Sequence, residues 1–181
     1  MAIYTKRGDK GMTSLYDSQN LQNIRVSKSS QIVRTIGTID ETNSYLGTIF
    51  GALDPETKKE IQNIQSSLFT IGSLIAGAKL SFSARKTLTL EEKIDKMEKV
   101  LPPLKNFILP GGNEVAAKLH YARSMARRME REVVELTKQE RLRPEILTYI
   151  NRLSDYLFVL ARWVNKKAQI KEEAWLPLNK R

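Results

Sequence analysis

The chain has 181 residues, a formal net charge of +10, no cysteine and a single histidine. This length can bury the core of one domain without disulfides or metal, so we expect one domain over residues 1–181. The lack of cysteine excludes a disulfide-stapled scaffold and any cysteine-based metal or nucleophile site. One histidine excludes a multi-histidine metal centre unless a second chain contributes, and we predict no metal site built by the protein itself.

The positive charge favours an anionic partner: nucleic acid, an acidic membrane surface or a phosphorylated small molecule. Basic and aromatic residues do not alternate as they do in single-strand binding platforms. The first residues, MAIYTKRGDKG, lack the apolar segment of a signal peptide. No apolar run approaches the roughly 20 residues that cross a bilayer. We therefore expect a cytoplasmic protein without a membrane segment.

Residues 1–33 show no helical period and are predicted to be irregular. Gly8 and Gly11 bracket Asp9 and Lys10. Glycines permit tight turns whose N–H groups converge on an anion, but a flexible terminus has the same composition. The segment matches neither the Walker A pattern nor G-x-G-x-x-G, so spacing alone leaves both interpretations open.

Three helices are predicted in the first part of the chain. Apolar residues recur every three or four positions over residues 34–53, and again after Asp54-Pro55, a pair typical of a helix start. Residues 77–87 are predicted to form a loop. Thr89 begins a capping box, so we expect the third helix to start there and to end at a pair of prolines.

Two further helices follow a Pro-Gly-Gly turn. The first is predicted from about residue 112 to residue 138 and the second from Pro144, each with an apolar stripe of helical period. Five helices without a convincing strand predict an all-α fold, a five-helix bundle over residues 34–170.

Arginines crowd the fourth predicted helix. At 100° per residue, Arg123, Arg127 and Glu130 lie about 90° from the centre of its apolar face. They can be a solvated surface with pairing three and four residues apart. A planar guanidinium also suits phosphate and carboxylate groups, and a stripe beside the core can meet a neighbouring helix. Asp40 has a similar position on the first predicted helix.

Two ring side chains near this helix have simple structural interpretations. His120 lies at the edge of the apolar face, where a lone histidine is most often a hydrogen-bonded structural residue. Phe107 precedes the Pro-Gly-Gly turn and is most simply explained as part of the core. Spacing alone assigns neither residue to a ligand.

Four blocks of sequence, in this order and spacing, resemble the PduO-type corrinoid adenosyltransferases. The blocks are YTKRGDKGMT at residues 4–13, VSK at 26–28 leading to GTIDETN at 37–43, FILPGG at 107–112 with RRMER at 127–131, and NRLSDYLF at 151–158. Any one block would be a weak match, but together they cover most of the chain. Members of this family transfer the 5′-deoxyadenosyl group of ATP to the cobalt of cob(I)alamin and release triphosphate.

The resemblance implies a homotrimer of five-helix bundles with active sites between subunits. It implies that residues 1–33 form an ATP-binding loop segment, that the substrates are ATP with Mg²⁺ and cob(I)alamin, and that a reductase donates electrons. Nucleic acid and membrane are not implied as partners. The catalytic positions by resemblance are Phe107 at the lower face of the corrin, Arg123 paired with Asp40 across the interface, and Arg127. The ATP-binding positions by resemblance are Thr5, Lys6, Arg7, Gly8, Thr13, Ser14, Lys28, Arg127, Arg128, Glu130, Arg131 and Asn151.

The chain departs from the family pattern in two places. Arg7 stands where threonine or glycine is commoner, and residues 29–32 read Ser-Ser-Gln-Ile where the family usually carries Asp-Asp and an arginine. We therefore assign no role to residues 29–34.

The implied chemistry agrees with the composition. Cob(I)alamin is itself a strong nucleophile, so the protein must supply positioning and charge stabilisation and not a nucleophile. A phenylalanine at the lower face of the corrin would exclude water and the lower axial ligand, which eases the reduction of Co(II).

Two alternatives stay open on the sequence. A basic helical nucleic-acid-binding module would account for the charge and predicts steeply salt-dependent binding. A non-catalytic ATP-binding regulator could keep the same motifs. Neither alternative predicts adenosylcobalamin formation from ATP and cob(I)alamin.

Overall fold

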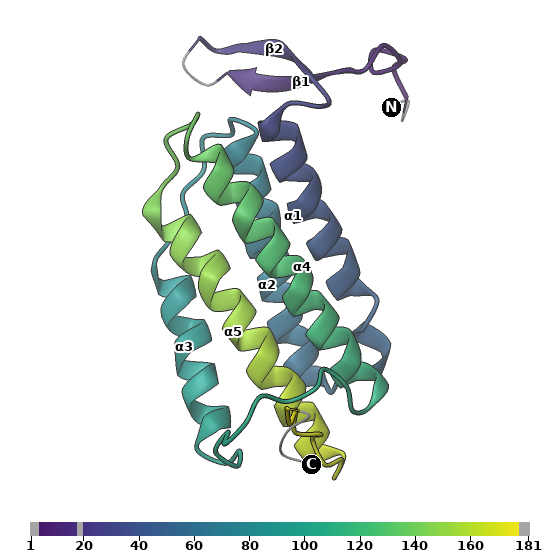
Figure 1. The fold of residues 1–181 in the computed structure, drawn as a ribbon. Helices are drawn as coiled ribbons and strands as arrows, with labels where there is room; N and C mark the ends of the chain where they lie inside the picture. Colours follow the sequence, from purple (N-terminus) through teal and green to yellow (C-terminus); the bar gives the residue numbers. More distant parts are fainter. Residues whose placement is uncertain (1–3, 18–19, 178–181) are drawn as a thin grey trace.

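The computed structural model describes residues 4–17 and 20–177. Within these residues, five α-helices form an elongated bundle with a short hairpin across one end (Figure 1). The elements are β1 (Met12–Asp17), β2 (Gln22–Ser27), α1 (Gln31–Gly47), the 3₁₀ turn η1 (Phe50–Ala52), α2 (Pro55–Ile75), α3 (Arg85–Glu98), α4 (Glu114–Leu136) and α5 (Pro144–Lys167). The predicted five-helix domain is confirmed.

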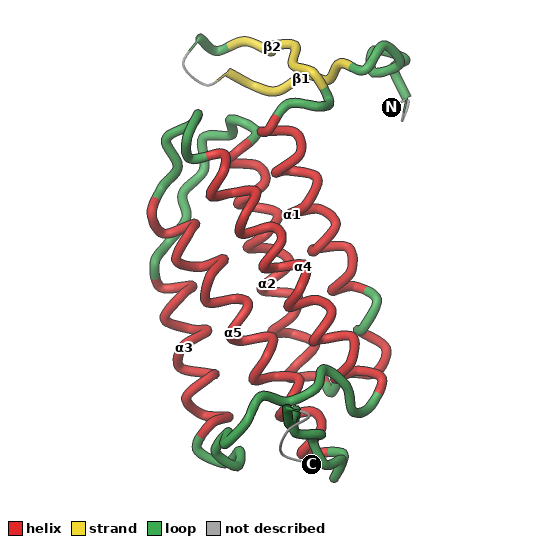
Figure 2. Tube along the Cα trace, in the orientation of Figure 1, coloured by secondary structure: helices red, strands yellow, loops and turns green. Residues whose placement is uncertain are grey.

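The prediction of an irregular N-terminal segment without strands was wrong. β1 and β2 pair antiparallel, with Met12 opposite Ser27 and Asp17 opposite Gln22 (Figure 2). Each strand has only six residues, and β2 exposes its first four side chains to solvent. A strand that buries so little shows only a weak alternation of apolar and polar residues, which is why the sequence pattern missed it.

The hairpin is attached to the C-terminal end of α2. The backbone N–H of Tyr16 donates to the carbonyl of Ala76 at 3.2 Å. A Cβ atom at Gly77 would lie 1.7 Å from the Tyr16 carbonyl oxygen, and the φ of Gly77 is +99°. Only glycine allows this close approach and this backbone conformation. The turn after α2 therefore fixes the position of the hairpin.

Two helix ends differ from their predictions. α1 ends at Gly47, and only the short turn η1 continues toward residue 53. α3 begins at Arg85, so Thr89 lies inside the helix, where its hydroxyl donates to the Arg85 carbonyl at 3.0 Å. The predicted capping box was therefore wrong, because a threonine within a helix can bond back to the preceding turn instead. Asp54 does cap α2, accepting from the Thr57 N–H at 3.0 Å.

The core lies where α4 packs between α1 and α5, while α3 covers α5 and α2 packs against α1. Its largest fully buried side chains include Leu119, Met129, Leu153, Tyr149 and Tyr156. No helix in the described ranges has both the length and the apolar composition needed to cross a membrane.

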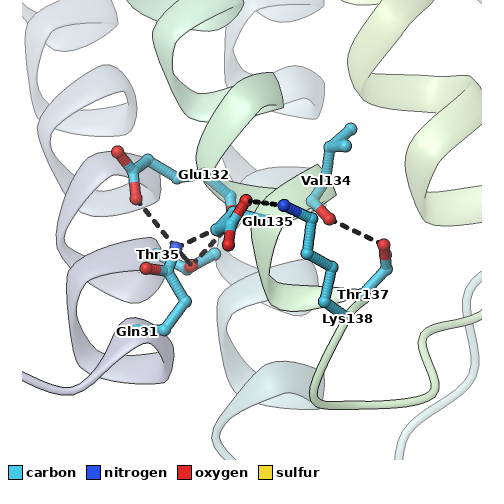
Figure 3. Close-up of polar contacts among 7 residues, drawn as sticks. All are labelled: Gln31, Thr35, Glu132, Val134, Glu135, Thr137 and Lys138. Atoms are coloured by element: carbon cyan, nitrogen blue, oxygen red, sulfur yellow. Dashed lines mark hydrogen bonds and ion pairs between the residues drawn. The ribbon is translucent and has the colours of Figure 1, made fainter.

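Polar contacts between α1 and α4 set the position of α4 near the hairpin (Figure 3). The Gln31 amide donates to the carbonyl of Glu132 at 3.1 Å and to its carboxylate at 2.8 Å. The buried hydroxyl of Thr35 donates to the same carbonyl at 3.1 Å. These bonds hold the end of α4 against α1 and leave the arginine-bearing surface of α4 facing away from the core.

Candidate active site

A cleft of about 690 Å³ opens where the segment between α3 and α4 meets the C-terminal tail. This end of the bundle lies opposite the hairpin (Figure 1). The cleft is lined by Phe107, by His120 and Arg123 of α4, by Phe158 of α5 and by Trp175 of the tail. Phe107 has 81% of its surface exposed. The interpretation of Phe107 as a core residue was therefore wrong, because the loop presents its ring to the cleft.

Arg123 is held by an aromatic ring. Its guanidinium carbon lies 5.4 Å from the centroid of the Phe158 ring, an arrangement typical of a cation–π contact. Burial lowers the pKa of Arg123, the nearby Arg127 lowers it further, and Asp155 opposes both effects. Within residues 4–17 and 20–177, no carboxylate forms an ion pair with Arg123. The cleft thus contains a permanent positive charge beside apolar rings.

A second cleft of about 510 Å³ adjoins the first at Arg123 and Phe158. It is lined by acidic and basic side chains of α3 and α5, among them Arg152 and Asp155. Arg152 donates to Asp155 at 2.6 Å and to Glu91 at 3.0 Å, so its charge is compensated. Arg123 lines both clefts and forms no ion pair with a carboxylate of the described residues, although the nearby Asp155 partly balances its charge.

His120 is buried, with 4% of its surface exposed, as the structural interpretation predicted. Its ring centroid lies 5.9 Å from that of Phe158. However, its Nε2 atom has no hydrogen-bond partner among the described residues, so the predicted hydrogen bonding is not found. The pKa of His120 is lowered, first by burial and second by the charge of Arg123. Both effects favour the neutral imidazole over its charged form.

The remaining predicted residues of α4 and α5 lie beyond Arg123, and all are exposed except the half-buried Glu130. The Asn151 amide of α5 donates to the Glu130 carboxylate at 2.7 Å. Arg131 donates to the carbonyl of Arg127 at 3.1 Å. Arg128 instead forms an ion pair with Glu41 of α1, which turns its guanidinium away from the others. The structure thus links Asn151 to Glu130 and Arg131 to Arg127, and it places Arg128 on the α1 side.

Arg25 of β2 organises the N-terminal residues, although the sequence pattern had not singled it out. Its guanidinium donates to the Arg7 carbonyl at 2.7 Å and to the Ser14 hydroxyl at 3.1 Å. A Cβ atom on Gly8 would lie 3.1 Å from the Lys28 ammonium nitrogen. The hairpin therefore gathers Arg7, Gly8, Ser14 and Lys28 into one basic surface.

Three other predicted residues of this segment lie around that surface. Thr5 and Lys6 are exposed, and Lys6 adopts a positive φ of +58°. Thr13 lies in β1 opposite Val26. Within one chain the hairpin lies at the opposite end of the bundle from the segment between α3 and α4 (Figure 1), and Phe107 of that segment lines the cleft. The predicted residues therefore do not form one continuous site in a single subunit.

Comparison with known proteins identifies the family. The sequence profile for cobalamin adenosyltransferase matches residues 3–164. The chain belongs to the cobalamin adenosyltransferase family. It is 40% identical to the corrinoid adenosyltransferase of Bacillus subtilis over 179 residues, which cover 94% of this chain and 90% of that protein. It is 41% identical to the corrinoid adenosyltransferase PduO of Citrobacter freundii over 170 residues, 90% of this chain, but spans only 49% of that longer protein.

Solved structures of this family share the fold. A phenylalanine-to-alanine variant of the PduO-type ATP:corrinoid adenosyltransferase from Lactobacillus reuteri, complexed with cobalamin and ATP, superposes with a TM-score of 0.89. It is 36% identical and covers 97% of this chain and 100% of that chain. An arginine-to-lysine variant of the same protein, complexed with ATP, gives a TM-score of 0.87. The resemblance inferred from the four sequence blocks is confirmed.

The cleft of this adenosyltransferase-family chain contains residues that sequence reasoning had not assigned. Phe158 belongs to the NRLSDYLF block, which assigned it no role, and the sequence offered no interpretation of the tail that carries Trp175. The tail pairs with the Phe107 segment through an isolated bridge between Ile108 and Ala174. A two-residue bridge leaves no periodic signal, so only the fold reveals it.

We expect the stability of the protein to depend on the protonation of its single histidine. The folded pKa lies below the ordinary value of about 6.5, so the unfolded chain binds this proton more readily. The free energy of unfolding should therefore fall as the pH drops below about 6.5, and this contribution should level off below the folded pKa. An NMR titration of the imidazole measures the pKa of His120 in the folded protein. Urea melts across the same pH range measure the free energy of unfolding. His120→Asn should remove this component, and an imidazole pKa at or above the ordinary value would contradict the prediction.

Proposed function

We propose that this protein transfers the 5′-deoxyadenosyl group of ATP to the cobalt of cob(I)alamin, giving adenosylcobalamin and triphosphate. The proposal rests on the cleft of a chain that belongs to the cobalamin adenosyltransferase family. In this cleft the exposed Phe107 lies near Arg123, which forms no ion pair within the described residues. An apolar ring suits the face of a corrin, and a fixed cation suits an anionic partner.

The proposed reaction needs no nucleophile from the protein. The electron pair of Co(I) forms the bond to the 5′ carbon of ATP, and the bond from that carbon to the triphosphate oxygen breaks. Cobalt is formally oxidised to Co(III), and triphosphate leaves with the bonding pair. The protein contributes by aligning cobalt, carbon and leaving oxygen and by stabilising the charge that collects on the triphosphate. Mg²⁺ bound with ATP would share that charge.

We assign the ATP site to two subunits of a homotrimer. The basic surface of the hairpin, with Arg7, Gly8 and Lys28, would contact the phosphates from one subunit. The row from Arg127 to Arg131 on α4, with Asn151, would contact ATP from the neighbour. An active site between subunits is supported because the hairpin and the segment between α3 and α4, which contains Phe107, lie at opposite ends of one bundle (Figure 1). A site shared between chains would bring these two ends together.

Asp40 and Arg123 support the same arrangement. Asp40 is exposed on α1 and forms no ion pair within the part of the chain that the structure describes, and the same holds for Arg123. We propose that each finds its counter-charge across the subunit interface. An electron-donating reductase and a cytoplasmic location stay predictions. No observation favours the nucleic-acid-binding or regulatory alternatives over the enzyme.

The direct test of the proposed function is a spectral assay with ATP and chemically reduced cob(I)alamin, in which adenosylcobalamin should form. Arg127→Ala should raise the KM for ATP and lower kcat/KM by about 10- to 100-fold, because a charge-assisted contact to phosphate is lost. Arg85→Ala, which removes an exposed arginine of α3 paired with Glu92, is the matched control. Unchanged kinetics in Arg127→Ala would remove this residue from the ATP site.

Phe107→Ala should impair the enzyme mainly when Co(II) must be reduced on the protein. Without the ring, water or the lower axial ligand can reach the cobalt and make its reduction harder. With pre-reduced cob(I)alamin, most of the activity should remain, because the transfer step itself does not need the ring. Parallel assays with cob(II)alamin plus reductant and with cob(I)alamin separate the two steps. Equal losses in both assays would rule out this role.

Asp40→Asn should weaken the trimer, the activity, or both, because the amide cannot balance the charge of Arg123. Sedimentation velocity at several protein concentrations measures assembly, and the cob(I)alamin assay measures activity. Glu56→Gln on α2, which removes an exposed carboxylate from another helix, provides the control for the charge change. A variant that keeps both its assembly and its turnover would argue against the interface pair.

A further inference from the structure

The segment that carries Phe107 is held at both ends by two residues of the same helix. Arg162 and Asn165 lie one turn apart near the C-terminal end of α5, with 3% and 2% of their surfaces exposed. Arg162 donates to the carbonyl of Pro102 at 2.8 Å, at the start of the segment. The Asn165 amide donates to the carbonyl of Gly111 at 3.1 Å, at the end of the segment.

The turn at the end of the segment is shaped to fit Asn165. The N–H of Asn113 donates to the Asn165 side-chain oxygen at 3.1 Å, so this amide is bonded through both of its polar atoms. Gly112 has a φ of +106°, and a Cβ atom there would lie 2.0 Å from the same oxygen. The Pro-Gly-Gly turn is therefore required for the close approach of Asn165 as well as for the change in chain direction.

A third anchor holds the middle of the segment. The Glu172 carboxylate of the tail accepts from the Arg162 guanidinium at 3.1 Å through both of its oxygens. The tail then pairs with the segment: the N–H of Leu109 donates to Glu173 O at 2.8 Å, and the N–H of Trp175 donates to Phe107 O at 2.7 Å. The Phe107 backbone is thus fixed directly, while its side chain stays free in the cleft.

We propose that Arg162, Asn165 and Glu172 are positioning residues that set the height and angle of the Phe107 ring for the corrin. The inference rests on the proposed function, and it assigns a role to a buried ion pair that the reaction itself does not require. An aromatic ring that must exclude a ligand from one face of a metal has to resist displacement, and a flexible loop would let water enter. The buried pair acts through the backbone of the segment and touches neither substrate.

Glu172→Gln tests the proposal, with Glu173→Gln as its matched control. The two residues are adjacent carboxylates in the tail, but the exposed Glu173 contributes only its backbone to the pairing. Glu172→Gln should lower turnover from cob(II)alamin plus reductant by about tenfold or more, because displacement of a positioning group by a fraction of an ångström has effects of this size. Turnover with cob(I)alamin and the KM for ATP should stay near the wild-type values. Glu173→Gln should match the wild type in each assay.

Two further measurements distinguish positioning from a general loss of structure. The amides of Leu109 and Trp175 should exchange hydrogen faster in Glu172→Gln, while amides in the middle of α4 keep their protection. In a Phe107→Ala background, adding Glu172→Gln should cause no further loss in the cob(II)alamin assay, because the ring through which it acts is absent. An additive loss, an equal loss in both cobalt assays, or identical behaviour of the two glutamate variants would overturn the proposal.

If Glu172→Gln does not fold, as judged by its thermal melt, Asn165→Asp tests the other end of the segment. It keeps the acceptor for Asn113 but loses the donor to Gly111. It should show the same selective loss with cob(II)alamin, and wild-type behaviour would contradict the proposal. A wild-type protein that forms no adenosylcobalamin from ATP and cob(I)alamin would instead reject the proposed function. The hydrogen-exchange comparison of Leu109 and Trp175 does not depend on activity.

Discussion

The apolar seam between α4 and α5 is the interaction on which the rest of the structure depends. Leu119, Met129 and Leu153 have no exposed surface, and burying each such side chain stabilises the fold by about 1.5–3 kcal/mol. Side chains on a helix share a face only every three or four residues, so packing this seam also decides where the flanks of α4 point. Arg123 and Arg127 lie on one flank because the seam occupies the face beside them.

At each end of the bundle, a short segment is attached to the end of a helix by polar or close backbone contacts. At one end, a close backbone contact at Gly77 attaches a hairpin that buries little of its own surface. At the other end, Arg162 and Asn165 hold a segment whose main aromatic side chain faces solvent. In both places polar contacts to the end of a helix replace the apolar packing that a short segment cannot supply. The helices therefore position the two segments of low intrinsic stability to which we assign substrate-binding roles.

The charged side chains of this protein differ in how deeply they are buried, and this burial decides what each one contributes. The Arg162–Glu172 pair is largely shielded from water, so breaking it would leave a buried charge without a partner. The Arg128–Glu41 pair is about half exposed on both sides and contributes little to stability. Arg123 belongs to neither class, because it is partly buried against Phe158 and forms no ion pair with a carboxylate of the described residues. Such a group is suited to a counter-charge from another molecule.

The sequence by itself determined the five helices, the apolar face of α4 and, through four spaced blocks, the family. Helical periodicity extends over many residues, so a helix is predicted correctly even when one of its ends is misplaced. The helix α3 is an example, because its start was predicted at Thr89 but lies at Arg85. Only the tertiary structure decided that Phe107 faces a cleft, that Arg25 gathers the N-terminal residues, and that the tail pairs with Ile108. Each of these depends on one or two contacts between segments far apart in the chain, and such contacts leave no periodic pattern in the sequence. The same reason explains His120: its place on the helix predicted burial, but the surrounding segments decided that its Nε2 atom has no partner among the described residues.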